Sequence, residues 1–366
     1  MIIKYLNFIK QWQEEKKILL PLMDKVFSKG HYVGVKAEEI GKFEKNICKT
    51  LKTNHCVTLN SGTDALTLAL YCSGVKKKDE VITTANSYIA TVGSIVHLGA
   101  KPVFADVQSD QNIDPTKIEK LITKRTKAIL VVHLTGRCAK MNEIMKIANK
   151  YKIKVIEDCA QSFKSKYKNK FAGTYGLVGC FSAHPLKNLN AMGDGGFIVT
   201  KNKKIATRIR LLANHGLKTR DVNEEFGYNS RLDNIQAGIL NYRLKKTKKL
   251  IKKRREIAKI YQKKLNSKFI FVPKETKNEF NTYHTFVIQV PRRDSLSVHL
   301  KKKKISTYIH YPIPTHKQKM FKNNYYKLPV TEMQCKKIIS LPIHQYLTLK
   351  EINYTIKTIN NFFSNE

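Results

Sequence analysis

Acidic residues are scarce in this chain. Its 366 residues include 28 Asp and Glu against 68 Lys and Arg, which gives a formal net charge of +40. A surplus of this size indicates an anionic partner, such as a nucleic acid, a membrane surface or a small anionic molecule. Composition does not distinguish among these three.

Long apolar runs and paired cysteines are also lacking. Residues 1–17 contain no apolar stretch as long as that of a signal peptide, and the longest charge-free run, Val81–Ala100, carries too many polar side chains to span a membrane. We therefore expect a cytoplasmic protein without membrane insertion. The seven cysteines are scattered and form no CxxC pair, which is typical of buried thiols and predicts neither a disulfide framework nor a metal site.

No repeat of fixed period is present, which excludes solenoid and propeller folds. Instead, helix-like segments alternate with apolar segments, and this predicts a mostly parallel sheet covered by helices on both faces. The expected helix and strand pairs are Thr63–Ser73 with Glu80–Thr83, Ile89–Leu98 with Pro102–Asp106, Lys117–Thr123 with Ala128–His133, and Met141–Tyr151 with Ile153–Glu157. The glycine-rich turn 193–196 before Phe197–Thr200 indicates an antiparallel return across the sheet.

The chain is long enough for a large domain and a smaller one. A helix-period segment from Leu232 to Leu265 has apolar residues on one face and leads toward the C-terminal part. We place the large α/β domain at residues 15–245, and the small α+β domain at residues 246–366 together with 1–14. In the small domain we expect strands at Phe269–Val272, Thr285–Val290 and Ser306–His310, and helices at Ser295–Lys302 and Leu349–Phe362.

One lysine stands out because its surroundings carry almost no charge. The window Phe171–Thr200 holds only two charged side chains, Lys187 and Asp194. Apolar, glycine-rich surroundings lower the pKa of an ammonium group, which suits an amine that reacts with an aldehyde. A lysine on a surface turn is the alternative.

Asp158 strengthens the first interpretation. It follows a predicted strand at the edge where α/β sheets bind ligands, although an acid there can also cap a helix. A carboxylate of this kind can keep a pyridine nitrogen protonated, which a lysine-bound pyridine cofactor needs in order to act as an electron sink. Asp158 and Lys187 together therefore indicate more than either residue alone.

A third feature is the start of a helix at Gly62 and Thr63. Their free backbone N–H groups suit a phosphate, and Ser182 can add a hydroxyl, although for such a string by itself an unliganded Ser/Thr helix cap is the commoner explanation. Tyr88 can stack on a planar ring or pack in the core.

Nine strings, in this order, together resemble the DegT/DnrJ/EryC1/StrS family over nearly the whole chain. They are NSGTDAL (60–66), ANSYIAT (85–91), GAKPVFADV (99–107), VIEDCAQS (155–162), CFSAHPLKNLNAMGDGG (180–196), NHG (214–216), GYNSRLDNIQA (227–237), IHYPIP (309–314) and SLPIH (340–344). The resemblance implies a nucleotide-sugar aminotransferase dependent on pyridoxal 5′-phosphate (PLP), with the fold type I of aspartate aminotransferase. It also implies a homodimer in which the active sites lie between subunits.

The resemblance gives roles to matching residues. Lys187 is the catalytic lysine that binds the cofactor, Asp158 the partner of the pyridine nitrogen, and Gln161 the partner of the ring hydroxyl. The remaining roles are Ser182, Gly62 and Thr63 for the phosphate, Tyr88 for the ring face, Asn229 reaching the phosphate from the partner chain, and Arg231, His184, His310 and Tyr311 for the substrate. His184 stands where the family often has an aromatic residue.

The expected reaction transfers an amino group from L-glutamate to a nucleotide-linked keto-sugar, with pyridoxamine 5′-phosphate as the alternate cofactor form. ANSYIAT and IHYPIPTHKQ favour C3 of a UDP- or dTDP-linked 3-keto sugar, as used in lipopolysaccharide O-antigen or other amino-sugar biosynthesis. C4 amination of a 4-keto-6-deoxy sugar is the alternative.

A rival hypothesis is a regulatory or nucleic-acid-binding protein. Its basis is the segment Arg243–Arg255, with nine basic residues in thirteen. A solvated helix face explains that segment more simply, because no nucleic-acid-binding motif accompanies it. We therefore expect no nucleic-acid partner.

Overall fold

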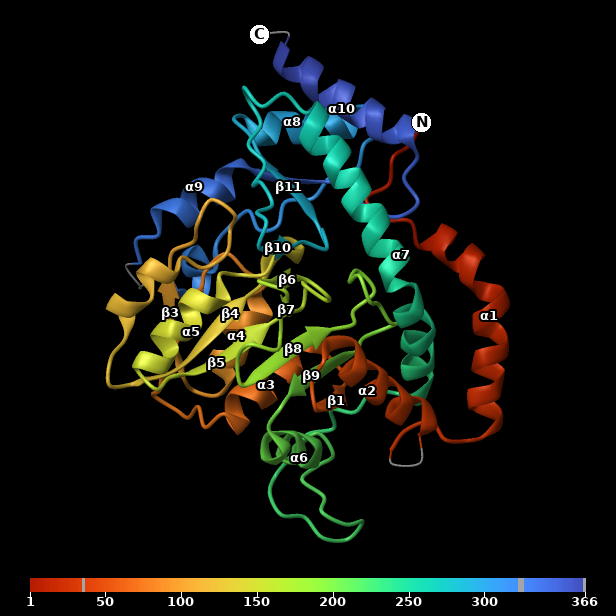
Figure 1. Ribbon diagram of the computed structural model, residues 1–366, viewed down its shortest axis with the longest axis vertical. Coiled ribbons are helices and arrows are strands. Elements are labelled where there is room, and N and C mark those ends of the chain that lie inside the picture. Colours follow the sequence, from red (N-terminus) through yellow and green to blue (C-terminus); the bar gives the residue numbers. More distant parts are fainter. Residues whose placement is uncertain (35–36, 322–325, 365–366) are drawn as a thin grey trace.

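The computed structural model describes residues 1–34, 37–321 and 326–364. A central sheet of seven strands has the order β1-β9-β8-β5-β4-β2-β3 (Figure 1). The strands from β8 to β3 run parallel, and β9 runs antiparallel between β8 and β1. The mostly parallel mixed sheet and the antiparallel return are thus confirmed. The strands are β1 His55–Leu59, β2 Glu80–Thr84, β3 Lys101–Ala105, β4 Thr126–Val132, β5 Lys154–Asp158, β8 Val178–Ser182 and β9 Gly196–Thr200.

Helices bury both faces of this sheet. In β4, Ile129 and Val131 pack in one core cluster with α2, α5 and α7, whereas Ala128 and Leu130 pack in a second cluster with α3 and α6. Because both faces are covered, the strands read as continuous apolar runs. The helices are α1 Phe8–Ser28, α2 Glu38–Leu51, α3 Gly62–Cys72, α4 Ile89–His97, α5 Met141–Lys150, α6 Lys203–Leu212 and α7 Asn234–Lys264.

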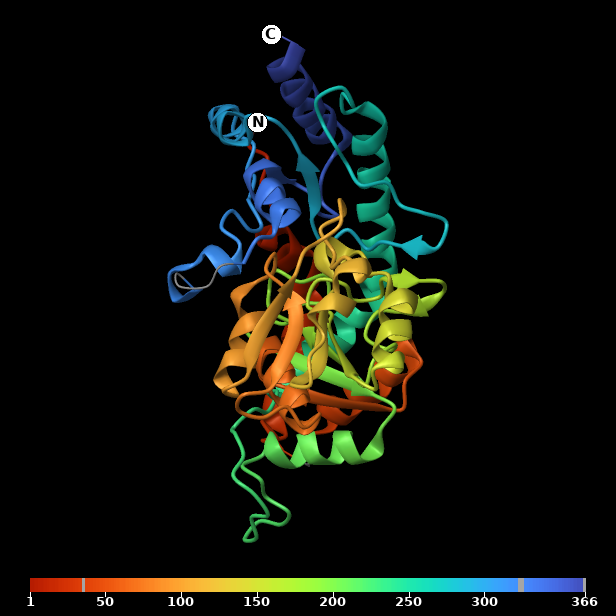
Figure 2. The ribbon, with the colours of Figure 1, turned by 90° about the vertical axis from the view of Figure 1, so that its left-hand side faces the viewer.

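The C-terminal part forms a separate layer at one end of the sheet. Figures 1 and 2 show both chain termini at that end and α6 at the opposite end. A third core cluster joins Ile3 near the N-terminus to the second half of α7, to the antiparallel strands β11 and β12, and to α8 and α10. The domain bounds stay a prediction. The elements are β10 Glu279–Phe280, β11 Phe286–Gln289, α8 Arg293–Lys302, α9 Pro329–Lys337, β12 Ile338–Leu341 and α10 Leu349–Ser364, and β10 pairs with the short hairpin β6 Lys166–Tyr167 and β7 Lys170–Phe171.

Three expected elements differ in the structure. Residues 117–123 do not form a continuous helix; two short 3-10 turns, Pro115–Lys117 and Glu119–Leu121, take up part of this stretch before β4 begins. Segments 269–272 and 306–310 are not full strands, because each makes only a single bridge, at Phe271 and at Tyr308. Prolines at 273 and 312 follow these segments closely, and proline cannot donate to a strand ladder.

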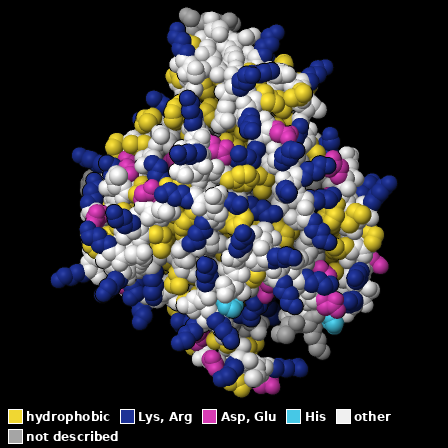
Figure 3. Space-filling model, in the orientation of Figure 1, with side chains coloured by type: hydrophobic (Ala, Val, Ile, Leu, Met, Phe, Trp, Pro, Cys, Tyr) yellow, Lys and Arg dark blue, Asp and Glu magenta, His cyan; other side chains and the backbone are white. Residues whose placement is uncertain are grey.

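The basic segment of α7 is only partly a solvated face. Its lysines are exposed or half-buried, but Arg243 and Arg254 are 7% and 3% exposed, so the expectation of a solvated face is wrong for them. Elsewhere basic side chains are spread over the surface, as Figure 3 shows for one face. No helix within the described ranges is long and apolar enough to cross a membrane. All seven cysteines are free, and six of them are buried.

Candidate active site

The start of α3 forms a cradle suited to an anion. Ser61 caps the helix, its Oγ accepting from the backbone N–H of Asp64 at 3.1 Å. Within the described chain, the N–H groups of Gly62 and Thr63 have no acceptor. Ser182, at the end of β8, lies directly against this turn, because a Cβ placed on Gly62 would come within 2.7 Å of Ser182 Cβ. Two free N–H groups at a helix N-terminus, beside a hydroxyl, favour a phosphate.

Asp158 ends β5 and is held by two hydrogen bonds. Thr91 Oγ1, in the first turn of α4, donates to Asp158 Oδ2 at 2.8 Å, and the backbone N–H of Ala160 donates to Oδ1 at 3.1 Å. The carboxyl is 5% exposed and Thr91 1%. The sheet therefore presents one oriented acidic group at the edge where its parallel strands end.

Gln161 and two tyrosines lie beside this acid. Gln161 Nε2 donates to the Tyr311 hydroxyl at 3.1 Å, and its Oε1 accepts from the backbone N–H of Thr135 at 2.8 Å. The rings of Tyr311 and Tyr88 are 6.2 Å apart, and Tyr88 is 61% exposed. Core packing of Tyr88, the alternative weighed from the sequence, is therefore wrong. Burial, followed by the charge of Asp158, raises the pKa of Tyr311, so its hydroxyl stays protonated.

The loop between β8 and β9 carries Lys187, and side chains of α1 and α7 hold this loop in place. Asn190 Nδ2 donates to the backbone carbonyl of Pro185 at 2.9 Å. The guanidinium of Arg243 donates to the carbonyls of Asn190 and Ala191 and forms a buried ion pair with Glu15 at 2.6 Å. Separating the two buried charges would leave each of them uncompensated, which is costly. The ion pair therefore holds the loop in one arrangement.

Burial lowers the pKa of Lys187, while the negative charge of Asp158 partly opposes this shift. The charge of Lys187 also acts on three imidazoles, those of His184, His284 and His310. Burial and then the charge of Lys187 lower the pKa of His310 to about 4 and that of His284 well below its usual value. The pKa of His184 is lowered as well, mainly by burial. The neutral form of the Lys187 amine is thus easier to reach than in a lysine exposed to water, and the imidazoles are held neutral, which suits proton transfer.

Asn229 and Arg231 lie at the other side of the cradle. Arg231 donates to Asn229 Oδ1 and to Asn214 Oδ1, both at 3.1 Å. The backbone carbonyl of Asn229 accepts from Asn60 Nδ2 at 3.5 Å, and Asn60 precedes the start of α3. Within one chain, Asn229 is therefore hydrogen-bonded to a residue that directly precedes the cradle. Its expected reach into a partner subunit stays a prediction.

His310 is the last residue of the segment 306–310, which is not a full strand, and Tyr311 follows it. His310 Nδ1 and Ser340 Oγ are 2.9 Å apart, which anchors this segment to β12. Gln161 ties Tyr311 to the Asp158 side of the site. The segment from the C-terminal part therefore lies beside the site, and a substrate role for His310 and Tyr311 stays a prediction.

Sequence reasoning missed two neighbours of the site. Thr91 belongs to the ANSYIAT string, but only the fold shows that its hydroxyl meets Asp158. His284 precedes β11, and its buried Nδ1 has no hydrogen-bond partner in the described part of the chain. No local pattern marks His284, because α7 and the turn at Thr135 bring it to the site from a distant part of the sequence.

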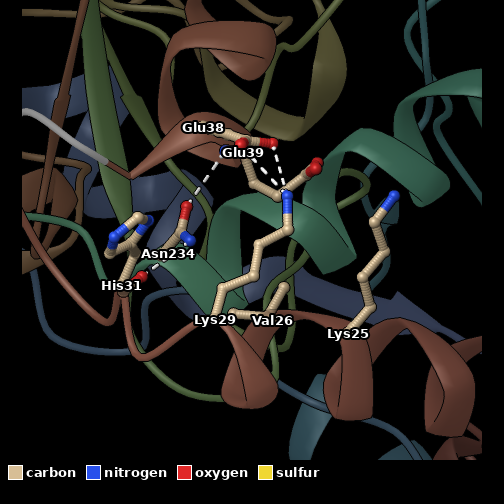
Figure 4. Close-up of a pocket in the computed structure, with 7 residues that line it drawn as sticks. All are labelled: Lys25, Val26, Lys29, His31, Glu38, Glu39 and Asn234. Carbon is tan, nitrogen blue, oxygen red and sulfur yellow. Dashed lines mark hydrogen bonds and ion pairs between the residues drawn. The ribbon is translucent and has the colours of Figure 1, made fainter.

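Two other clusters of polar side chains do not offer free groups for binding or catalysis in the same way. His133, Glu157 and Cys159 lie close enough to hold a metal, but the Glu157 carboxylate already accepts from His133 Nε2 and from three backbone N–H groups, and His133 Nδ1 accepts from Ala139. The pocket drawn in Figure 4 joins α1, α2 and α7, and several of its groups pair with one another: Lys29 with Glu38, and Asn234 with the backbone of Glu39 and of His31. Contacts within the fold therefore account for both groups of side chains.

Comparison with known proteins agrees with this geometry. Residues 16–360 match the model of the DegT/DnrJ/EryC1/StrS aminotransferase family. The chain belongs to this family. Its relatives include the dTDP-3-amino-3,6-dideoxy-alpha-D-galactopyranose transaminase of Aneurinibacillus thermoaerophilus, 37% identical over 99% of both chains. Another is the UDP-2-acetamido-2-deoxy-3-oxo-D-glucuronate aminotransferase of Pseudomonas aeruginosa, 36% identical over 98% of this chain and 100% of the relative.

A solved structure gives the same result. The crystal structure of DesV from S. venezuelae, in complex with a ketimine intermediate, superposes with a TM-score of 0.95 at 32% identity, covering 99% of this chain and 98% of DesV. The protein is therefore a PLP-dependent aminotransferase of nucleotide sugars with the fold expected from its sequence.

The residues present fit PLP. The cradle of Gly62, Thr63 and Ser182 suits its phosphate, and Asp158 offers one oriented carboxylate for its pyridine nitrogen. Lys187 offers an amine whose pKa is lowered. These groups come from the ends of β1, β5 and β8, which the parallel sheet brings to one edge.

Proposed function

We propose that this aminotransferase transfers the amino group of L-glutamate to C3 of a UDP- or dTDP-linked 3-keto sugar, in the biosynthesis of an amino sugar for a cell-surface polysaccharide. Both relatives named above have names that place their chemistry at C3, one on a dTDP sugar and one on a UDP sugar. Amination at C4 is the alternative.

The observation that carries the aminotransferase part of this proposal is that Lys187, Asp158 and the α3 cradle all follow strands at the same end of the sheet, whereas the C3 assignment rests on the names of the relatives. We assign Gly62, Thr63 and Ser182 to the cofactor phosphate, Asp158 to the pyridine nitrogen, and Gln161 to the ring hydroxyl. Tyr88 is exposed beside Tyr311 and is assigned to the ring face. When bound, PLP supplies an electron sink that stabilises negative charge on the carbon next to an amine.

Lys187 is the base in both half-reactions. Its lowered pKa raises the fraction of neutral amine, which is the form that can accept a proton. In the first half-reaction Nζ removes the proton from the α-carbon of glutamate, and in the second it delivers a proton to the former carbonyl carbon of the sugar. Because one group serves both, we expect ping-pong kinetics.

The remaining polar groups are assigned to the substrates. His310 and Tyr311 border the sugar from the C-terminal part, and His184 lies on the lysine loop. Arg231 can bind a carboxylate, either of glutamate or of a uronic acid, through the planar guanidinium that such anions favour. The positive charge of the whole chain attracts these anionic ligands.

A panel of purified nucleotide-linked keto-sugars tests the regiochemistry. The protein, PLP and L-glutamate are incubated with each sugar, and the amino-sugar product is identified by mass spectrometry and NMR. We expect amination of 3-keto substrates. Amination of 4-keto substrates alone would show that the C3 assignment is wrong and leave the aminotransferase assignment intact.

We also propose a homodimer whose sites are shared, with Asn229 supplied by the partner chain. Mixing Lys187→Ala protein with Asn229→Ala protein tests this. In hybrid dimers, one of the two sites would hold both native residues, so activity above that of either variant alone is expected. If each site is complete within one chain, mixing restores nothing.

A further inference from the structure

One polar residue interrupts the apolar strand β12. Ser340 stands in the sequence Ile-Ile-Ser-Leu, and all four residues are 0% exposed. A buried hydroxyl costs free energy unless it is hydrogen-bonded, so packing alone does not explain a serine at this place. Ser340 Oγ lies 2.9 Å from His310 Nδ1, and this contact gives the hydroxyl its partner. The serine therefore serves His310 rather than the apolar core around it.

The backbone of Ser340 is held on both sides. It pairs with Val287 in the antiparallel ladder of β11 and β12. On the other side, its N–H donates to the carbonyl of Tyr308 at 2.7 Å, and its own carbonyl accepts from the N–H of Tyr308 at 3.2 Å. A side chain on a strand held in this way is placed more precisely than one on a loop. Ser340 thus offers its hydroxyl from a fixed position.

Aromatic rings lie around the imidazole of His310. Their centroids are 5.8, 5.9 and 6.1 Å from that of His310, for Tyr311, Tyr308 and Tyr5 in this order. Burial is the largest cause that lowers the pKa of His310 to about 4, so the ring is neutral near neutral pH. A neutral imidazole carries its proton on one nitrogen only. Because Ser340 occupies Nδ1, Nε2 is the nitrogen left for a ligand.

We propose that Ser340 is a positioning residue that fixes the ring of His310 with Nε2 toward the keto-sugar. This inference rests on the proposed function, in which His310 borders the sugar. Without the hydroxyl at Nδ1, the imidazole can turn about its Cβ–Cγ bond or shift its proton, and Nε2 then no longer offers one fixed kind of hydrogen bond. The sugar would lose a contact, whereas Lys187 would keep its own surroundings.

Tyr5 is the other polar group close to this serine, and it is the alternative partner. Burial raises the pKa of the Tyr5 phenol, and Ser340 is the largest influence in the opposite direction. The phenol oxygen has no hydrogen-bond partner within the described part of the chain, however, which favours His310. If the hydroxyl of Ser340 serves Tyr5, loss of the phenol has the same effect as loss of the serine hydroxyl. Tyr5→Phe, which keeps the ring, distinguishes the two partners.

The first test is a double-mutant cycle with Ser340→Ala, His310→Gln and the double variant, all loaded with PLP. The sugar is the one that the panel above shows to be aminated. We expect Ser340→Ala to raise the KM of the sugar about five- to tenfold, the share of one neutral hydrogen bond. The half-reaction with L-glutamate alone, followed by the absorption of bound PLP, should keep its rate. In the His310→Gln background, Ser340→Ala should change the KM by less than about twofold.

Each of four results would overturn the proposal. An unchanged KM in folded Ser340→Ala protein would show that the contact does not matter for the sugar. Additive effects of the two substitutions would show that Ser340 acts without His310. Equal slowing of both half-reactions would show a general structural role. Tyr5→Phe should have the KM of the wild type, and a rise as large as that of Ser340→Ala would assign the serine hydroxyl to Tyr5.

The second test needs neither sugar nor turnover. NMR of protein labelled in its histidine ring nitrogens reports the tautomer of His310, whose signal is assigned from its absence in His310→Gln protein. We expect a single tautomer in the wild type and a mixture in Ser340→Ala. A mixture in the wild type, or one unchanged tautomer in both, would overturn the proposal.

Both tests stay decisive if a variant or the proposed function fails. If Ser340→Ala does not fold, Ser340→Cys, which is similar in size and a weaker hydrogen-bonding group, replaces it with the same expected directions. If no sugar is aminated, the proposed function fails in the panel, while the NMR spectrum still decides whether Ser340 orients His310.

Discussion

The hydrogen bond between Thr91 and Asp158 offers a sharp test of how the site is built. Thr91→Val replaces a buried side chain by one of nearly equal shape and removes only the hydroxyl that donates to Asp158 Oδ2 at 2.8 Å. Thr91 is 1% exposed, so water cannot easily replace the lost donor. A hydrogen bond to an ionised group contributes about 1.5–3 kcal/mol.

If this hydrogen bond orients Asp158 toward the cofactor nitrogen, most of its free energy is lost from PLP binding. At 1.4 kcal/mol per factor of ten, the expected rise in the dissociation constant is about 10- to 100-fold. The assay is a titration of cofactor-free protein with PLP, followed by visible absorption. Thr91→Ser is the matched control and should bind like the wild type.

Two results would contradict this reasoning. The first is Thr91→Val protein that binds PLP with wild-type affinity, since the hydroxyl then does nothing for Asp158. The second is equal weakening by Thr91→Ser and Thr91→Val, which would point to packing rather than to the hydrogen bond. A thermal melt of each variant separates loss of fold from loss of affinity.

Three other perturbations follow from contacts in the structure. Gly62→Ala places a Cβ within 2.7 Å of a side chain on β8, so we expect PLP and inorganic phosphate to bind at least about tenfold more weakly, measured by titration. Arg243→Met leaves the buried carboxylate of Glu15 unpaired, and we expect denaturant unfolding to show a loss of about 3–5 kcal/mol. The pKa of His344 is lowered to about 4, mainly by burial, so the unfolded chain takes up its proton first as the pH falls. Stability should therefore fall by up to about 3 kcal/mol between about pH 6.5 and pH 4, and His344→Asn should reduce this slope in unfolding measurements.

The first two of these have a control variant in the same chain. Gly41→Ala in α2 meets no atom within 4 Å and should leave PLP affinity unchanged. Lys246→Met lies on the exposed face of α7 and should cost little stability, in contrast to Arg243→Met. Equal effects of test and control variants would contradict the first two predictions, and a slope unaffected by His344→Asn would contradict the third.

Local patterns were enough to place five strands of the seven-stranded sheet, but β1 and β8 were not among the expected strands. The segment that ends near Asp158 reads as a continuous apolar run because helices cover both faces of the sheet. The charge-poor window around Lys187 indicated an unusual lysine, and the structure gives its pKa the expected downward direction. These inferences needed only residues that are close together in the sequence.

What the sequence could not show depends on distant partners. Thr91 and Asp158 are 67 residues apart, and Arg243 and Glu15 are 228 apart, so no spacing rule connects them. The composition of α7 indicated a solvated basic face, but Arg243 and Arg254 turn inward because buried carbonyls and a carboxylate bind them. Likewise, Phe271 makes a single bridge where an apolar run suggested a strand.

The most direct test of the central claim is covalent labelling of the cofactor lysine. Purified protein is incubated with PLP, reduced with borohydride, digested, and analysed by mass spectrometry. We predict a yellow protein that is bleached by reduction, with the pyridoxyl label on the peptide that contains Lys187 and no specific label in Lys187→Ala protein. A label on another lysine in folded wild-type protein, or the same labelling in Lys187→Ala protein, would contradict the assignment of the active site.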